Sequence, residues 1–158
     1  NTNIENTVTR MGGSGLLETE VQSLSDFLFD DHALPLPPNP NLAATGLTQS
    51  QMNGKLLFYH PSLGCADCHA GKHTTDGENW DVGTFTDLEV DIHGLNGSDP
   101  LSLNTPSLKG LYYSEPYLHD GSAKDLYDVL NMTSATMGVT VSLTGQQQLD
   151  LVNYLLTL

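Results

Sequence analysis

The sequence has few basic residues, few cysteines and no long apolar run. Only 5 of its 158 residues are Lys or Arg, against 19 Asp or Glu, so the formal net charge is −14 at pH 7. So acidic a surface repels nucleic acid and anionic lipid, which excludes a typical DNA- or RNA-binding role. A partner attracted by charge should be basic at the contact. No apolar run approaches the roughly 20 residues of a membrane-spanning helix, so no membrane span is predicted.

Both cysteines of the chain lie in one short stretch, residues 64–69, which reads G-C-A-D-C-H. A Cys-x-x-Cys-His motif predicts a covalently attached haem c. The thiols of Cys65 and Cys68 can each add to one vinyl group of the porphyrin, and His69 can supply the proximal iron ligand. Because haem c is attached outside the cytoplasm, the motif also predicts a periplasmic or extracellular protein.

Three other readings of the motif fit the sequence less well. A thioredoxin-like redox pair expects a βαβ context, whereas the flanking segments have a helical pattern. A structural zinc site needs a second pair of ligands, and the sequence has no other Cys-x-x-Cys to supply it. A disulfide across so short a loop would not require His69.

The chain is expected to hold one haem domain and an N-terminal appendage. Residues 1–36 are predicted to be a helical tail, with a helix within 16–29, and a proline-rich linker extends to about residue 45. Residues 46–158 form the mono-haem domain. Because the chain starts at Asn1 without Met, we expect a mature or trimmed form. Met11-Gly12 and its following helix resemble Met137-Gly138 and the last helix. The tail is therefore either the end of a preceding cytochrome-like unit or an unrelated amphipathic helix.

The haem domain is predicted to be all-α, with cytochrome c-like helices around one haem and a long irregular loop. Capping boxes at Thr48 and Thr144, each with Gln three residues later, predict two helix starts. The first of these helices should end near His60. Residues 71–104 should form the irregular loop, with a short β-hairpin as an option.

Smaller features of this domain are also predicted from local patterns. Pro106 is expected at the first position of a short helix. Asp120 or Ser122 is expected to cap a helix over 123–131. The buried stripe of the last helix is expected to comprise Leu149, Val152, Leu155 and Leu156.

Four stretches of the haem domain resemble a known family. They are L-L-F at 56–58, D-V-G-T at 81–84, T-P-S-L-K-G at 105–110 and P-Y-L-H-D-G-S at 116–122. Together they resemble the C-terminal, electron-transfer domain of bacterial di-haem cytochrome c peroxidases and their MauG-like relatives, over residues 46–158. Those peroxidases need two haems, and this chain has a single haem motif. Peroxidase activity is therefore not carried over by the resemblance.

The resemblance implies further residues at the haem. It places Pro106, Lys109 and Tyr117 along the haem wall, with Lys109 either facing a propionate or solvated. It places His119 near the haem edge rather than on the iron. The family also binds Ca²⁺ near the Thr-Pro turn at the interface of its two haem domains, so a Ca²⁺ site here would need such an interface.

The sixth iron ligand decides between electron transfer and catalysis. A methionine thioether closes the site and raises the reduction potential, whereas an open face admits peroxide. Met137 is the preferred candidate because its spacing to Tyr154 resembles that between the axial Met and the last helix of small cytochromes c. Met132 is the runner-up, since its position resembles that of the ligand in the di-haem peroxidases. The remaining options are an open site or one of three histidines: His73, His93 and His119.

The function predicted first is an electron-transfer cytochrome c carrying one His/Met-ligated haem, with no catalytic residue. The alternative is a peroxidase- or oxidase-type subunit that another haem domain or chain completes. A third option is a module that mainly docks the haem domain onto a larger haem complex. The partner of an electron carrier would be a redox protein.

Overall fold

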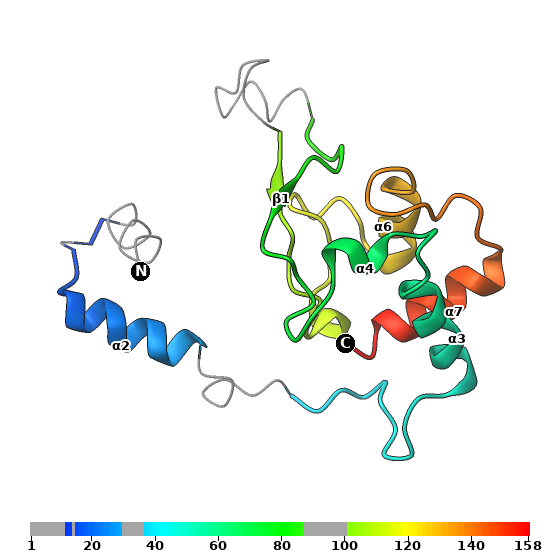
Figure 1. The fold of residues 1–158 in the computed structure, drawn as a ribbon, viewed down its shortest axis with the longest axis horizontal. Helices are drawn as coiled ribbons and strands as arrows, with labels where there is room; N and C mark the ends of the chain where they lie inside the picture. Colours follow the sequence, from blue (N-terminus) through cyan, green and yellow to red (C-terminus); the bar gives the residue numbers. More distant parts are fainter. Residues whose placement is uncertain (1–11, 14, 30–36, 87–100) are drawn as a thin grey trace. The chain divides into compact units, whose positions relative to one another are not determined.

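A computed structural model describes residues 12–13, 15–29, 37–86 and 101–158 of the chain (Figure 1). The chain divides into two compact units, Asn1–Pro38 and Asn39–Leu158. In the first unit, α2 (Glu18–Phe29) occupies the stretch predicted to be helical. Met11 lies outside the described residues, so the proposed likeness between the tail and the last helix stays a prediction.

Two helices form the centre of the second unit. They are α3 (Gln49–Phe58) and α7 (Gly145–Leu155). Both begin with the predicted capping box. The Thr48 and Thr144 hydroxyls accept from the backbone N–H three residues later, and the side-chain oxygen of the Gln at that position accepts from the threonine N–H. These local signals were therefore sufficient to locate the helix starts.

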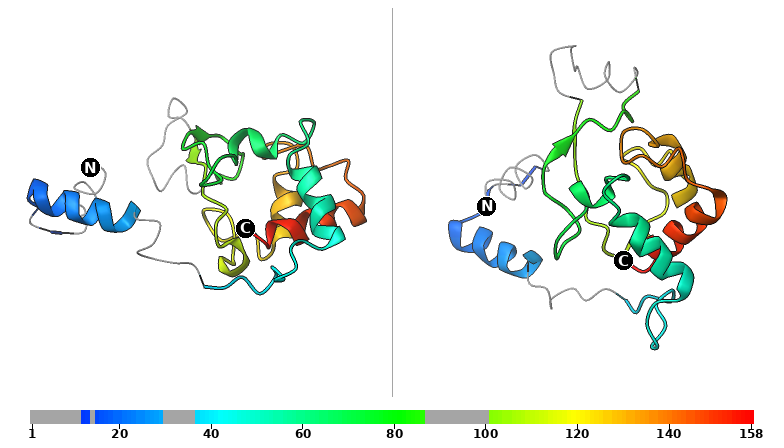
Figure 2. Two further views of the ribbon diagram at one scale, coloured as in Figure 1. Left: turned by 60° about the horizontal axis from the view of Figure 1, so that its bottom comes forward. Right: turned by 45° about the vertical axis from the view of Figure 1, so that its right-hand side comes forward.

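The α3 and α7 helices cross in close contact, as both views of Figure 2 show. Gly54 lies at the crossing, where a Cβ would meet the Asp150 carbonyl oxygen at 1.9 Å. The Phe58 and Tyr154 rings pack edge to face, with centroids 5.5 Å apart. Phe58 and Leu151 are among the most buried side chains of the core. A side chain at position 54 would thus separate the two helices.

The buried face of α7 differs from the predicted stripe. Leu149 is 39% exposed, so the prediction was wrong at this position, whereas Leu156 is half-buried and packs against the core. The buried residues of the helix are Asp150, Leu151, Val152, Tyr154 and Leu155. A carboxylate can be buried here because its oxygens accept hydrogen bonds from Ser50 Oγ at 2.6 Å, Gln146 Nε2 at 2.9 Å and Asn53 Nδ2 at 3.3 Å.

Helix α6 (Leu126–Met132) lies within the predicted region but has a different cap. The N-cap is Asp125, whose Oδ1 accepts from the Asp128 N–H at 2.9 Å. Asp120 instead accepts from the Ser122 N–H inside its own turn, so the predicted caps at these two residues were wrong.

The segment after Thr105 is not helical, and the predicted helix start at Pro106 was wrong. A single 3₁₀ turn, η1, follows at Leu111–Tyr113. Two short strands, β1 (Asn79–Trp80) and β2 (Leu103–Asn104), pair antiparallel, in line with the hairpin considered for residues 71–104. The described part of the fold is mostly helical with this one small strand pair. None of its helices is long and apolar enough to cross a membrane.

Candidate functional site

The Cys-x-x-Cys-His stretch forms a one-turn helix, α4 (Cys65–Cys68), shortly after α3. Gly64 precedes it with φ of +74°, a left-handed conformation that glycine adopts without strain. Both cysteines are free and half-buried, and Cys65 packs against the hydrophobic core. Residues three apart on a helix share one face, so the two thiols are available on the same side of the turn.

The thiols of α4 are not activated for redox chemistry. Burial, followed by the nearby Asp67 carboxylate, raises the pKa of Cys65 above its usual 9.0. Burial also raises the pKa of Cys68, with further contributions from Asp76 and Asp67. Reactive redox cysteines have a lowered pKa instead. The environment of α4 is therefore the opposite of what a thioredoxin-like pair needs.

His69 is buried at the end of α4, with 7% of its surface exposed. Its Nδ1 lies 3.2 Å from the Thr74 carbonyl oxygen. Because a carbonyl can only accept, Nδ1 carries the proton and Nε2 keeps its lone pair. Burial lowers the pKa of His69 below its usual 6.5, and the backbone carbonyls of Thr74 and Pro106 partly oppose this. The ring is thus neutral at pH 7 and oriented by its second nitrogen, as an axial ligand requires.

These residues fit a haem c. Two unpaired thiols lie on one helical turn, and the next residue is a buried, neutral imidazole with Nε2 unprotonated. Elsewhere in the described part of the chain, no three His, Cys, Asp or Glu side chains gather in a way that could hold a metal ion. A haem bound here would supply a one-electron redox centre.

The loop that carries Met137 is fastened next to the motif. The Thr136 hydroxyl donates to the Val82 carbonyl at 2.7 Å, and the Val139 N–H donates to the Leu63 carbonyl at 3.0 Å. Gly138 has φ of +114°, and a Cβ there would lie 2.8 Å from the Leu63 oxygen and 3.5 Å from Cys65 Sγ. Met137 itself is half-buried. The loop is therefore held before Met137 by Thr136 and after it by Val139. The second of these bonds is to Leu63, two positions before α4 begins.

The other candidate ligands have different surroundings. Met132 is the last residue of α6 and is 55% exposed. His73 is exposed in the loop after α4. His119 is exposed, with its Nδ1 3.3 Å from Thr84 Oγ1 and its ring against Phe85. His93 lies outside the described residues.

The residues carried over from the family resemblance divide into two groups. Pro106 is brought to the site, since its carbonyl interacts with the His69 ring. Lys109 is exposed, and Tyr117 is buried in the core with its hydroxyl donating to the Leu111 carbonyl at 2.9 Å. The placement of Lys109 and Tyr117 along a haem wall stays a prediction.

Sequence reasoning missed Thr74 and Gly138. Thr74 supplies the carbonyl that orients His69, although its backbone is left-handed with φ of +51°. No local signal announces this, because β-branched residues rarely adopt that conformation. Gly138 could have been noticed as a glycine directly after Met137, since glycine often marks a close backbone approach.

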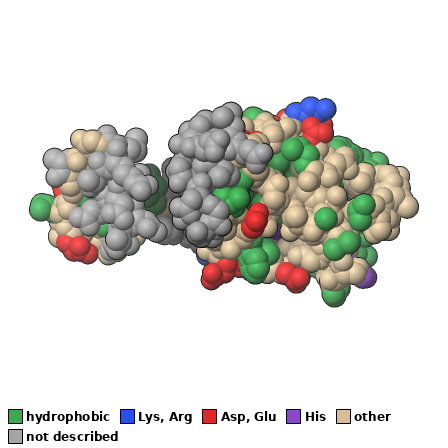
Figure 3. Space-filling model, turned by 90° about the horizontal axis from the view of Figure 1, so that it is seen from above, with side chains coloured by type: hydrophobic (Ala, Val, Ile, Leu, Met, Phe, Trp, Pro, Cys, Tyr) green, Lys and Arg blue, Asp and Glu red, His purple; other side chains and the backbone are tan. Residues whose placement is uncertain are grey.

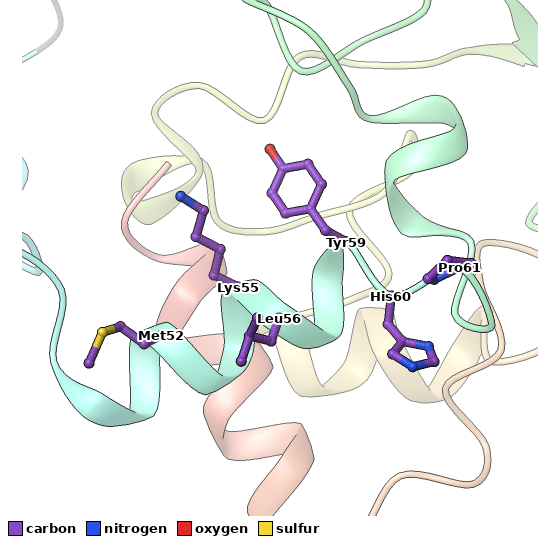
Figure 4. Close-up of a pocket in the computed structure, with 6 residues that line it drawn as sticks. All are labelled: Met52, Lys55, Leu56, Tyr59, His60 and Pro61. Atoms are coloured by element: carbon purple, nitrogen blue, oxygen red, sulfur yellow. The ribbon is translucent and has the colours of Figure 1, made fainter.

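A separate groove of about 460 Å³ lies on the solvent side of α3 and its C-terminal end (Figure 4). It is lined by Met52, Lys55, Leu56, Tyr59, His60 and Pro61. Leu56 is 72% exposed there, so the groove is open and mainly apolar. It contains neither cysteine of the motif, and we assign it no role in the site.

No protein-family model matches the chain. The chain is 31% identical to the hydrazine synthase subunit gamma of Kuenenia stuttgartiensis, over an alignment of 159 positions that covers 78% of this chain and 45% of that protein. The solved structure of the Kuenenia stuttgartiensis hydrazine synthase matches 91% of this chain and 56% of its own, with 26% identity and a TM-score of 0.68.

A second solved structure has the same fold. It is a MauG-like protein associated with microbial copper homeostasis, with 21% identity, a TM-score of 0.53, and 70% of this chain and 44% of that chain covered. At 21% identity this likeness shows a shared fold. The chain spans about half the length of the proteins that it matches.

Proposed function

We propose that this chain is an electron-transfer c-type cytochrome with one haem, attached through Cys65 and Cys68 and bound by His69. The hydrogen bond from His69 Nδ1 to the Thr74 carbonyl carries the proposal, because it leaves Nε2 as the donor atom beside two free thiols. A structural histidine would not need this tautomer next to a Cys-x-x-Cys pair.

Met137 is the proposed sixth ligand. Its support is the loop geometry: hydrogen bonds on both sides of Met137 tie the backbone to Val82 and Leu63, close to Cys65. Met132, at the exposed end of α6, has no comparable tie to α4 among the described contacts, and is the runner-up. A thioether ligand favours the ferrous state and leaves peroxide no coordination position, which suits electron transfer.

The ligand assignment is tested by replacing each methionine in the haem-loaded chain. We expect Met137→Ala to convert the haem from low to high spin and to permit reaction with peroxide. Met137→His should keep the haem low-spin and lower the reduction potential. The matched control is Met132→Ala, which should leave the spectrum unchanged. If Met132→Ala is the variant that becomes high-spin, Met132 is the ligand and electron transfer still stands.

The second candidate is an oxidase- or peroxidase-type haem enzyme subunit. It is favoured by the match to a subunit of hydrazine synthase and by the fact that the chain spans about half of that protein. In this proposal the chain works in a larger complex, and another haem domain or chain completes the catalytic site. An unmutated protein that is already high-spin and reduces peroxide rapidly would support this candidate and exclude the first.

Location and partner are proposed on the same grounds. A covalent haem c implies attachment outside the cytoplasm, so we infer a periplasmic or extracellular protein. With 19 acidic and 5 basic residues, a redox partner is expected to be basic at the contact. On the face drawn in Figure 3, acidic side chains lie scattered rather than in one cluster. On that face, the acidic charge available to a basic partner is therefore spread rather than concentrated.

A further inference from the structure

The loop after His69 contains one residue in an unfavourable backbone conformation. Thr74 has φ of +51°, in the left-handed region that β-branched side chains rarely adopt. Such a conformation is unfavourable and persists only where the surrounding contacts hold it. The contacts that hold Thr74 therefore indicate what the loop is built to position.

The Thr74 hydroxyl makes two short hydrogen bonds. It accepts from the Leu108 backbone N–H at 2.7 Å and donates to the His73 carbonyl at 2.7 Å. The next residue strengthens the attachment, since the Thr75 hydroxyl donates to the Thr105 carbonyl at 2.6 Å. The loop is thus fastened to the segment Thr105–Leu108 by two consecutive threonine side chains.

The carbonyl of the same residue orients the imidazole. Thr74 O accepts from His69 Nδ1 at 3.2 Å. A connected series of contacts therefore runs from the Leu108 N–H through the Thr74 hydroxyl and backbone to the His69 ring. A hydrogen bond at the second nitrogen of a ligating histidine fixes the ring and strengthens its donor atom.

We propose that Thr74 is a positioning residue for the haem iron: its hydroxyl holds the left-handed backbone that aims its carbonyl at His69 Nδ1. This inference rests on the proposed function, in which His69 is the proximal ligand. A stronger imidazole donor stabilises ferric over ferrous iron. Loss of the hydroxyl therefore weakens the donor and raises the reduction potential.

The test compares variants of the full haem-loaded chain by potentiometric titration and by NMR of the ferric His69 ring. Thr74→Val removes the hydroxyl and keeps the shape of the side chain. The expected change is a fall of about tenfold in the ferric-to-ferrous ratio at a fixed ambient potential, by analogy with the roughly tenfold loss of metal affinity at the low end of what such outer partners cause. For a one-electron couple this is an upward shift of about 59 mV. Thr74→Ser keeps the hydroxyl and should retain the original potential and spectrum.

A matched control removes a hydroxyl that does not touch the ring. The Thr157 hydroxyl donates to the Tyr154 carbonyl at 2.6 Å, so Thr157→Val loses a comparable bond and should leave the potential unchanged. Thr74→Gly keeps the proposal testable if Thr74→Val fails to mature, because glycine tolerates the left-handed conformation. Thr74→Gly should still shift the potential upward, because the hydrogen bond from the Leu108 N–H to the Thr74 hydroxyl is lost.

Two results would overturn the proposal. If Thr74→Gly and Thr74→Val unfold more easily but keep the original potential and His69 resonances, Thr74 is only structural. If Thr157→Val or Thr74→Ser shifts the potential as much as Thr74→Val, the effect is not specific to the hydrogen bond between the Thr74 hydroxyl and Leu108. Failure of the proposed function looks different: the unmutated chain would then lack a covalent, His69-bound haem before any variant is compared, and the Thr74 proposal would fall with it.

Discussion

A methyl group at position 54 should disrupt the central helix crossing. In the structure, a Cβ on Gly54 would lie 1.9 Å from the Asp150 carbonyl oxygen, 2.6 Å from its carbon and 2.7 Å from Tyr154 Cβ. Two of these atoms are α7 backbone, so no side-chain rotation relieves the overlap. Gly54→Ala must therefore move α3 away from α7.

The size of the effect follows from two opposing contributions. Overpacking a closely packed core typically costs about 1–3 kcal/mol, and a backbone clash this close belongs at or above the upper end. Replacing glycine by alanine inside a helix returns about 1 kcal/mol of helix propensity. We therefore expect a loss of at least about 2 kcal/mol in the free energy of unfolding. With a urea m-value of about 2 kcal/mol/M, the midpoint should fall by about 1 M.

The matched control is Gly145, a glycine of the other helix, α7. Gly145 begins α7, and a Cβ there would meet nothing within 4 Å. Gly145→Ala should be neutral or stabilising by up to about 1 kcal/mol. Urea unfolding of the haem-loaded chains, followed by circular dichroism, measures both. If Gly54→Ala is as mild as Gly145→Ala, the close approach of α3 and α7 is wrong.

Two further predictions concern charge. Hydrogen bonds hold the pKa of Asp150 below its usual 3.8, although desolvation opposes this. The largest contribution comes from the Ser50 hydroxyl, and Gln146 and Asn53 add to it. The contribution of the ionised Asp150 carboxylate to the free energy of unfolding is therefore present above about pH 4, and it is lost as pH falls through the lower native pKa. Asp150→Asn should flatten the decrease of the urea midpoint between about pH 5 and about pH 2, and parallel curves for the two proteins would contradict this. Because the chain carries a net charge of −14, its electron exchange with a cationic inorganic complex should slow as salt rises, while exchange with an anionic complex should accelerate. Equal salt dependence for both complexes would refute an acidic docking surface.

The sequence was most informative where a signal is local. The capping boxes at Thr48 and Thr144 lie within four residues, and both helix starts were predicted correctly. Near α6 the same reasoning was ambiguous. Asp120 and Ser122 were the expected caps, but the fold uses Asp120 in its own turn and places Asp125 at the N-cap.

Features that depend on distant contacts were not predictable. Asp150 is buried because Ser50 and Asn53, 100 and 97 positions away, satisfy its oxygens. No helical pattern in the last segment reveals such partners, and an acidic residue is normally assigned to the solvent face. The predicted stripe on α7 therefore did not include Asp150.

The haem motif itself was evident from the sequence, but its surroundings were not. Pro106 was expected to start a helix. In the structure its neighbours Thr105 and Leu108 bond to Glu78 and Thr74, so the segment is extended beside His69. The conformation of Thr74 depends on these same contacts, across more than 30 positions of sequence.

Every other proposal for this protein depends on the covalent attachment of one haem through Cys65 and Cys68. The most direct measurement is the intact mass of the denatured chain after expression in a host with cytochrome c maturation machinery. We expect the polypeptide mass plus one haem, and the polypeptide mass alone for the double variant Cys65→Ala, Cys68→Ala. An unmodified mass for the original chain, with haem that extracts freely into acidified acetone, would contradict it.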